Sequence, residues 1–172
     1  LLPKYDWLHL HHEDFTGQYG KFYNNYANMP WYIEQVKEAE DAARRFGFHK
    51  VSQAKLAVAK RIKEFVSGGG FLFAMCSATD SYDIALSAEG VDICERMYDG
   101  DPADPQAQEK LNFENTFAFT NFRLMRDPMQ YEFSDIDNNF PDRGLRQDND
   151  YFNIFEFSAK WDPIPSMLTQ NH

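Results

Sequence analysis

The chain has 172 residues, 43% of them hydrophobic, so it is long enough to form a globular domain with a buried core. Acidic residues outnumber basic ones by 27 to 17, and the net charge of −10 argues against nucleic acids and anionic membrane surfaces as partners. The sequence contains no run of 18 apolar residues that would suggest a transmembrane helix. Its two cysteines, Cys76 and Cys94, form neither a disulfide framework nor a C-x-x-C motif.

The first half of the chain alternates between strand-like and helix-like segments. Residues 5–11 (YDWLHLH) predict a short buried strand. A helix is expected from Pro30, which suits a first turn, to Gly47, which suits a helix end. A second helix is expected after Ser52, a good N-cap, and before the break at residues 67–70. The expected buried faces comprise Ile33, Val36, Ala39, Ala43 and Phe46 in the first helix, and Leu56, Ala59, Ile62, Phe65 and Val66 in the second.

A continuous apolar run at residues 71–75 (FLFAM) predicts an inner strand of a parallel sheet, and a helix is expected after it. This order of strands and helices favours an α/β layer fold. From residue 99 to about residue 168 the chain is irregular, acidic and aromatic. Two stretches within it, residues 116–122 and 131–133, have strand-like composition.

No domain linker is present, so we expect a single domain over residues 1–172, with the region after residue 99 as irregular insertions. Because the chain starts at Leu1, with neither an initiator methionine nor a signal peptide, we expect a fragment or a processed product. The domain is therefore expected to be incomplete in this chain.

The strongest candidate for chemistry is Cys76, which directly follows the apolar run. Ala74 stands two residues before it and Ala78 two residues after it. A turn that leads from a strand into a helix and exposes a nucleophile is so tight that these two positions must be small. The helix dipole would favour the thiolate, and the backbone N–H of Ser77 would point at a developing oxyanion. The alternative is a small buried cysteine that ends a core strand.

A second group of polar residues ends the first strand: His9, His11, His12, Glu13 and Asp14. If the two strands pair in parallel, this group lies near the cysteine, at the edge where open α/β sheets bind ligands. His11 or His12 would then act as a base or a substrate contact, with Glu13 and Asp14 as further substrate contacts.

A metal site is another interpretation of the same group. Strand alternation puts His9 and His11 on one face, where both could bind a metal ion with Glu13 or Asp14 as third ligand. Otherwise, His9 is a core histidine, and the two acidic residues start a solvated loop.

Other acidic and aromatic residues give weaker signals. Asp80 is a candidate substrate contact, although Asp80 and Asp83 could instead stabilise the start of a helix. The acidic stretches 99–104 and 135–139 have oxygen ligands at calcium-like spacing; the second lacks the Gly and Glu of an EF-hand loop, and both are expected to form turns. Five aromatic residues could stack on a sugar or pack in the core: Trp31, Tyr32, Tyr151, Phe152 and Trp161.

The segment 69–84 (GGFLFAMCSATDSYDI) resembles the cysteine turn of class I glutamine amidotransferase-like and ThuA-like domains. Together with residues 5–19, 99–104 and 150–172, it is similar to longer Bacteroidetes proteins labelled asparagine synthetase B. The resemblance implies a flavodoxin-like, three-layer α/β fold with a parallel sheet. It also implies a cysteine-dependent amidase or glutaminase-like activity, and a periplasmic or cell-envelope location. No nucleotide-binding signature is present, so no cofactor is expected.

The sequence departs from this family in two respects. Both glycines of its G-x-C-x-G pattern are alanine here, and the only histidine after Cys76 is His172, which lacks the H-x-E context of the family's base. Three functions therefore remain open: an amidase acting on a small carboxamide, a catalytically silent envelope module that binds a protein or a sugar-like ligand, and a metal-dependent hydrolase using His9, His11 and Glu13.

Overall fold

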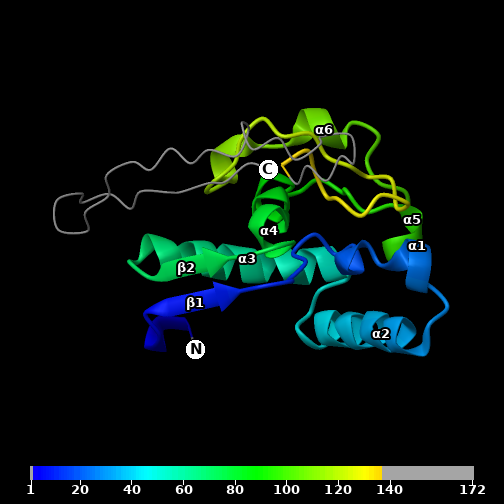
Figure 1. Cartoon of the computed structure of the whole chain (residues 1–172), viewed down its shortest axis with the longest axis horizontal. Coiled ribbons are helices and arrows are strands. Elements are labelled where there is room, and N and C mark those ends of the chain that lie inside the picture. Colours follow the sequence, from blue (N-terminus) through cyan, green and yellow to red (C-terminus); the bar gives the residue numbers. More distant parts are fainter. Residues whose placement is uncertain (1, 137–172) are drawn as a thin grey trace, which may run out of the picture.

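The computed structural model describes residues 2–136, which form a mixed α/β structure (Figure 1). Strands β1 (Trp7–Leu10) and β2 (Phe71–Ala74) pair in parallel, from Trp7 opposite Phe71 to Leu10 opposite Ala74. Helices α2 (Pro30–Arg45) and α3 (Val51–Ser67) lie between the strands in sequence, and α4 (Ala78–Ser87) follows β2. The predicted α/β class and the parallel pairing of these strands are confirmed.

The remaining elements are single turns of helix. They are η1 (Leu2–Lys4), η2 (Tyr19–Lys21), α1 (Tyr23–Tyr26), α5 (Arg96–Asp99), α6 (Ala107–Lys110) and η3 (Phe113–Asn115). None of the helices in the described part of the chain is both long enough and apolar enough to cross a membrane.

Helix α2 begins and ends where the sequence predicts, but its buried face is shifted. Pro30 occupies the first turn, and the chain leaves the helix through Gly47, which has a φ of +84°. Tyr32 and Ala43 are buried, whereas Ile33 and Phe46, which were expected in the buried face, are exposed. Helix α2 packs against α3, and its buried residues Tyr32 and Ala43 join a hydrophobic cluster with Tyr19, Val51 and Ile84.

Helix α3 starts two residues earlier than the expected cap would place it. Lys50, not Ser52, is the N-cap residue, and Ser52 lies in the first turn. The side chain of Gln53 takes over the capping role, because its Oε1 accepts hydrogen bonds from the N–H groups of His49 and Lys50, at 3.2 and 3.3 Å. Further along the helix, Ala59 and Ile62 are buried, as expected.

The two-stranded sheet is covered on one face only, among the residues described. Leu10 packs with Ala59, Ile62, Tyr82 and Leu86 of α3 and α4 in one hydrophobic cluster. The other face carries aromatic side chains whose exposed fractions are large: 61% for Trp7, 57% for Phe71 and 42% for Phe73. For the described part of the chain, the expectation of an inner strand buried on both faces is therefore wrong.

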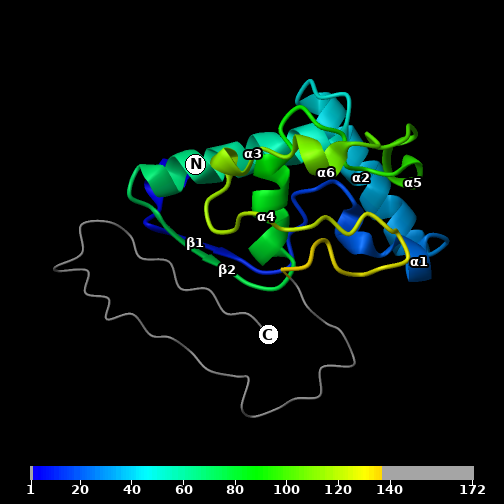
Figure 2. The same ribbon diagram turned by 90° about the horizontal axis from the view of Figure 1, so that it is seen from above.

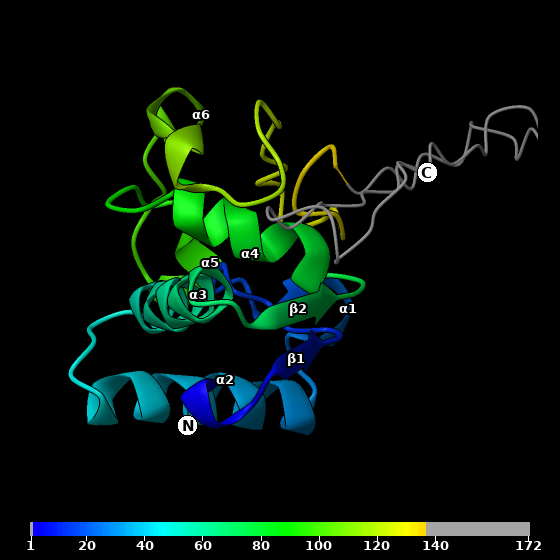
Figure 3. The ribbon, with the colours of Figure 1, turned by 90° about the vertical axis from the view of Figure 1, so that its left-hand side faces the viewer.

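Helix α4 is the centre of the described structure. It lies between α3 and β2 on one side and the irregular chain after residue 99 on the other (Figures 1 and 3). Figure 2 shows the same stacking from above, with the long loop of residues 116–136 crossing α4. Every side chain from Tyr82 to Ser87 is buried, and α4 contributes to both hydrophobic clusters.

A buried carboxylate fastens the irregular region to α4. Asp83 is fully buried, and its two oxygens accept hydrogen bonds from the consecutive N–H groups of Phe117, Ala118 and Phe119, at 2.7 to 2.8 Å. Burial raises the pKa of this carboxyl group, and the three N–H donors oppose that shift. Residues 116–122 and 131–133 are not strands; one isolated antiparallel bridge, Leu124 with Ser134, is formed in this region of the described chain.

Candidate functional site

The chain turns from strand β2 into helix α4 at Cys76. The backbone of Cys76 has a φ of +53°, in the left-handed region that residues with a side chain rarely adopt, and the residue is exposed. Backbone hydrogen bonds hold both sides of this turn: the N–H of Met75 donates to Leu10 at 3.1 Å, and the N–H of Thr79 donates to the carbonyl of Cys76 at 2.9 Å. The thiol is therefore presented to solvent by a tightly constrained backbone.

The small residues around the turn have the expected environments. Ala78 is fully buried among the residues that pack beneath the sheet, so a larger side chain at this position would collide with them. Ala74 is half-buried and lies opposite Leu10 in the ladder. Ser77 is buried at the N-cap of α4, and its side chain makes no capping hydrogen bond. The start of α4 thus follows the cysteine directly, with the N–H groups of Ala78 and Thr79 donating to the carbonyls of Met75 and Cys76.

His11 and His12 follow strand β1 at the same edge of the sheet. The ladder runs to Leu10 opposite Ala74 and includes the bond from Met75 to Leu10, so the chain after β1 runs beside the Cys76 turn. Both histidines are exposed, and their ring centroids lie 3.8 Å apart, nearly edge to face. The Glu13 carboxylate accepts a hydrogen bond from the N–H of His11 at 2.5 Å, which fixes the carboxylate at the same edge.

The predicted metal ligands are not brought together. His9 is neither a core residue nor a partner of His11: it lies on the open face of the sheet, with its ring centroid 5.1 Å from that of Phe73. Within residues 2–136, one group of potential ligands has its atoms within 4.8 Å of one another, and it does not include His9, His11 or Glu13.

Two of the predicted substrate contacts have internal partners. Asp14 is buried and accepts hydrogen bonds from the N–H and hydroxyl of Thr16, both at 2.6 Å, and from the N–H of Gly20 at 2.9 Å. Asp80, in the first turn of α4, is also buried and accepts from the hydroxyl of Ser134 at 2.9 Å. Their carboxylates organise the loops beside the turn, and Glu13 is left as the exposed carboxylate among the three.

Ser81 joins the two halves of the site and was not expected from the sequence. Its hydroxyl donates to the carbonyl of Glu13 at 2.9 Å and accepts from the N–H of Phe15 at 3.3 Å. The loop after β1 is thereby attached to the helix that carries the cysteine. The available signal was a serine within a buried helical face, where a polar side chain needs a partner.

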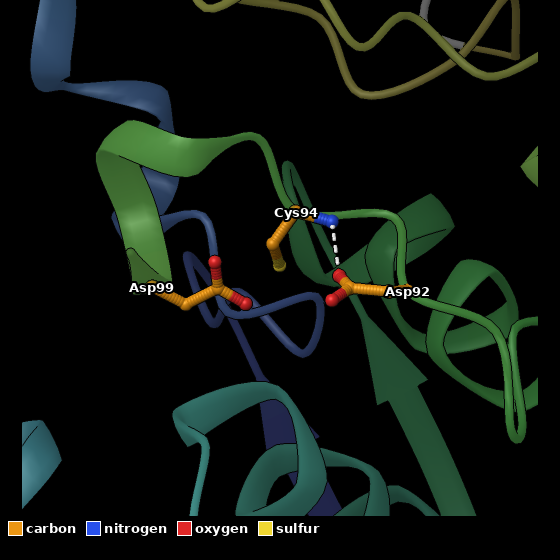
Figure 4. A group of neighbouring side chains, drawn as sticks. All are labelled: Asp92, Cys94 and Asp99. Atoms are coloured by element: carbon orange, nitrogen blue, oxygen red, sulfur yellow. Dashed lines mark hydrogen bonds between the residues drawn. The ribbon is translucent and has the colours of Figure 1, made fainter. Parts of the chain in front are cut away.

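A second cluster lies around Cys94, and of its members only Asp99 was expected from the sequence to belong to a ligand-like group. The side chains of Asp92, Cys94 and Asp99 point at one another (Figure 4), and Asp92 accepts a hydrogen bond from the N–H of Cys94 at 3.0 Å. Burial raises the pKa of the Cys94 thiol, which donates to the carbonyl of Thr16 at 3.3 Å. Burial also raises the pKa of Asp99.

A lysine already supplies the positive charge at this cluster. The ammonium of Lys50 lies 2.5 Å from Asp92, 3.0 Å from Asp99 and 2.6 Å from Asp101. Partial burial opposes the charge, but the hydrogen bonds to these carboxylates prevail and raise the pKa of Lys50. Asp104 pairs with Lys110, so the acidic stretch 99–104 is engaged in ion pairs rather than arranged as an open calcium loop.

A pocket of about 230 Å³ opens beside Lys50, between the start of α3 and the end of α4. It is lined by Phe15, Thr16, Lys50, Ser52, Gln53, Leu56, Ala85, Ala88, Gly90, Val91, Asp92 and Ile93. Neither Cys76 nor the two histidines belong to its lining, so this pocket is separate from the cysteine turn.

The sugar-stacking aromatics expected from the sequence fall in different environments. Trp31 is 45% exposed, whereas the adjacent Tyr32 belongs to the core. Tyr151, Phe152 and Trp161, like His172 and the second half of the acidic stretch 135–139, lie outside the described residues.

No protein-family model, curated protein or solved structure shows a significant match to this chain.

Proposed function

We propose that the Cys76 turn is the active site of a cysteine-dependent amidase or glutaminase-like hydrolase, built on a flavodoxin-like α/β fold. The observation that carries the proposal is the exposed Cys76 at a φ of +53° between β2 and α4. Such a backbone costs about 1–3 kcal/mol for a residue with a side chain. Glycine would make the same turn without that cost, so the cysteine side chain itself is the feature to be explained.

The reaction follows from the groups at the turn. The thiolate of Cys76 attacks the carbonyl carbon of a carboxamide, and the Ser77 N–H and the start of α4 stabilise the oxyanion of the tetrahedral intermediate. The amine leaves with a proton, and a thioester remains on the sulfur. Water then attacks the thioester, which releases the carboxylic acid and restores the thiol.

A base is needed to move the protons in both steps. His11 and His12 are our candidates, because both are exposed and follow β1 at the edge where Cys76 lies. An imidazole is the side chain best suited to accept and return a proton near neutral pH. From the resemblance noted above, we also propose a periplasmic or cell-envelope location.

The first test is the rate of alkylation by iodoacetamide as a function of pH, in the folded protein. An activated Cys76 keeps its rate down to about pH 6, whereas an ordinary thiol loses about tenfold per unit below roughly pH 8.5. Cys76→Ser removes the signal, and release of ammonia from a panel of small carboxamides then identifies a substrate. A pH profile like that of a free thiol, with no amide turnover, would instead favour a catalytically silent binding module on the same fold.

A further inference from the structure

The two chain segments that meet at Cys76 contain no lysine or arginine; their basic side chains are the imidazoles of His9, His11 and His12. Residues 5–20 and 65–95 have neither lysine nor arginine, although the whole chain has 17. They do contain acids, and three of these follow the ends of the paired strands: Glu13 and Asp14 after β1, and Asp80 after β2. The hydrogen bond from Ser81 to the carbonyl of Glu13 holds the first of them against the helix that carries the cysteine.

The exposed carboxylate at this edge is that of Glu13. Asp14 and Asp80 are buried and engaged with Thr16, Gly20 and Ser134, so they contribute negative charge without facing a ligand. Glu13 is exposed, and the N–H of His11 fixes its orientation. A ligand that approaches Cys76 therefore meets one oriented carboxylate with two more behind it.

Two lysines packed near these segments are not free to offset the charge. Lys21 is buried, and its ammonium donates to the carbonyls of Met125, Asp127 and Glu132; burial lowers its pKa to about 8. Lys50, at the next loop, is surrounded by the three carboxylates described above. Within residues 2–136, neither ammonium is available to a ligand at the turn.

We infer that the Cys76 site accepts uncharged or cationic ligands and rejects anionic ones, with Glu13 as the specificity-determining residue. This inference rests on the proposed function for the position of the site and names the substrate class: a carboxamide whose remaining groups carry no net negative charge. The physical reason is that carboxylates at the mouth of a site lower the local concentration of anions and raise that of cations.

The experiment compares three methanethiosulfonate reagents of different charge: methyl (neutral), aminoethyl (cationic) and sulfonatoethyl (anionic). In each case the thiolate attacks the reagent's sulfenyl sulfur, a mixed disulfide forms, and methanesulfinate leaves. Rates on the full chain are divided by those on N-acetylcysteinamide, an uncharged thiol. We expect the cation-to-anion ratio at Cys76 to exceed that of the small thiol by about tenfold in low salt, and to shrink in about 0.5 M salt.

A matched pair of variants assigns the effect to the site. Glu13→Gln is expected to lower the ratio about threefold, whereas Glu38→Gln, which removes the same charge from the exposed surface of α2, should leave it unchanged. The inference would be overturned if the cation-to-anion ratio at Cys76 equalled that of the small thiol, or if both variants lowered this ratio equally.

The result separates this inference from the proposed function. If the thiol is charge-selective but no amide is turned over, the inference about charge stands and the proposed amidase activity is ruled out. If amides are turned over without charge selectivity, the amidase activity stands and the inference about charge is ruled out. Failure of Cys76 to react with any of the three reagents would remove the site, and both proposals with it.

Discussion

The two cysteines of this chain sit in opposite environments, although both lie within the part that packs around α4. Cys76 is exposed on a backbone that a side chain disfavours, whereas Cys94 is 1% exposed, hydrogen-bonded to Thr16 and next to a lysine held by three carboxylates. Around Cys94 the carboxylates of Asp92 and Asp99 are paired with the Lys50 ammonium, whereas the Cys76 turn leaves a thiol, two imidazoles and a carboxylate open to solvent. Placing reactive groups in solvent at a strained turn is typical of a site that acts on ligands.

The largest expected difference is in thiol labelling. In the folded protein, Cys76 should react with a neutral alkylating reagent at least about a thousandfold faster than Cys94, because Cys94 becomes accessible only when the structure opens. Mass spectrometry of peptides after timed labelling measures both rates in one sample. Comparable labelling rates would show that the region around Cys94 opens readily and that the two cysteines do not differ in accessibility.

Removing the Lys50 ammonium should destabilise the region around Cys94. We expect Lys50→Ala to lower the free energy of unfolding by about 2 kcal/mol, because three carboxylates lose their common partner while remaining partly screened by water. Labelling of Cys94 should accelerate in parallel. Lys60→Ala is the control: it removes an exposed lysine that pairs with Glu89 on the surface, and a change of at most about 0.5 kcal/mol is expected in chemical denaturation.

Substitutions at the two cysteines should change stability with opposite signs. Cys94→Ala leaves a small void in the core and is expected to cost about 1–2 kcal/mol. Cys76→Gly removes the conformational strain of the turn and is expected to stabilise the protein by about 0.5 kcal/mol, while abolishing any thiol chemistry. Denaturation midpoints of both variants test the pair, and destabilisation by Cys76→Gly would argue against strain at the turn.

The smallest effect expected is an alkaline one near Cys94. Burial raises the pKa of Tyr19, Tyr32 and Tyr98, that of Tyr32 to about 12. Their contribution to stability is fully present below about pH 10, where unfolded tyrosines keep their protons, and is lost as the pH rises from there toward the folded-state pKa values. Absorbance at 295 nm should therefore show a group of tyrosines that titrates only with unfolding. Complete titration of all tyrosines near pH 10 in the folded protein would contradict this.

The sequence was informative where local rules dominate. The alternation of apolar segments predicted the strands and helices, and the alanines around Cys76 predicted the tight turn. It was less informative where a tertiary partner decides: Ser81, Asp83 and Lys50 look like ordinary helical or loop residues until the chain segments they bind are placed beside them. Ile33 illustrates the same point, because the partners of α2 in the folded chain determine which of its sides is buried.

The hydroxyl of Ser81 has a mechanical consequence. It donates to the carbonyl of Glu13 and accepts from the N–H of Phe15, so two hydrogen bonds connect the loop after β1 to α4. The thiol, the imidazoles and the carboxylate would then keep their relative positions as a ligand arrives. Association at Cys76 should accordingly follow a single exponential whose rate rises linearly with ligand concentration, with no slow closing phase.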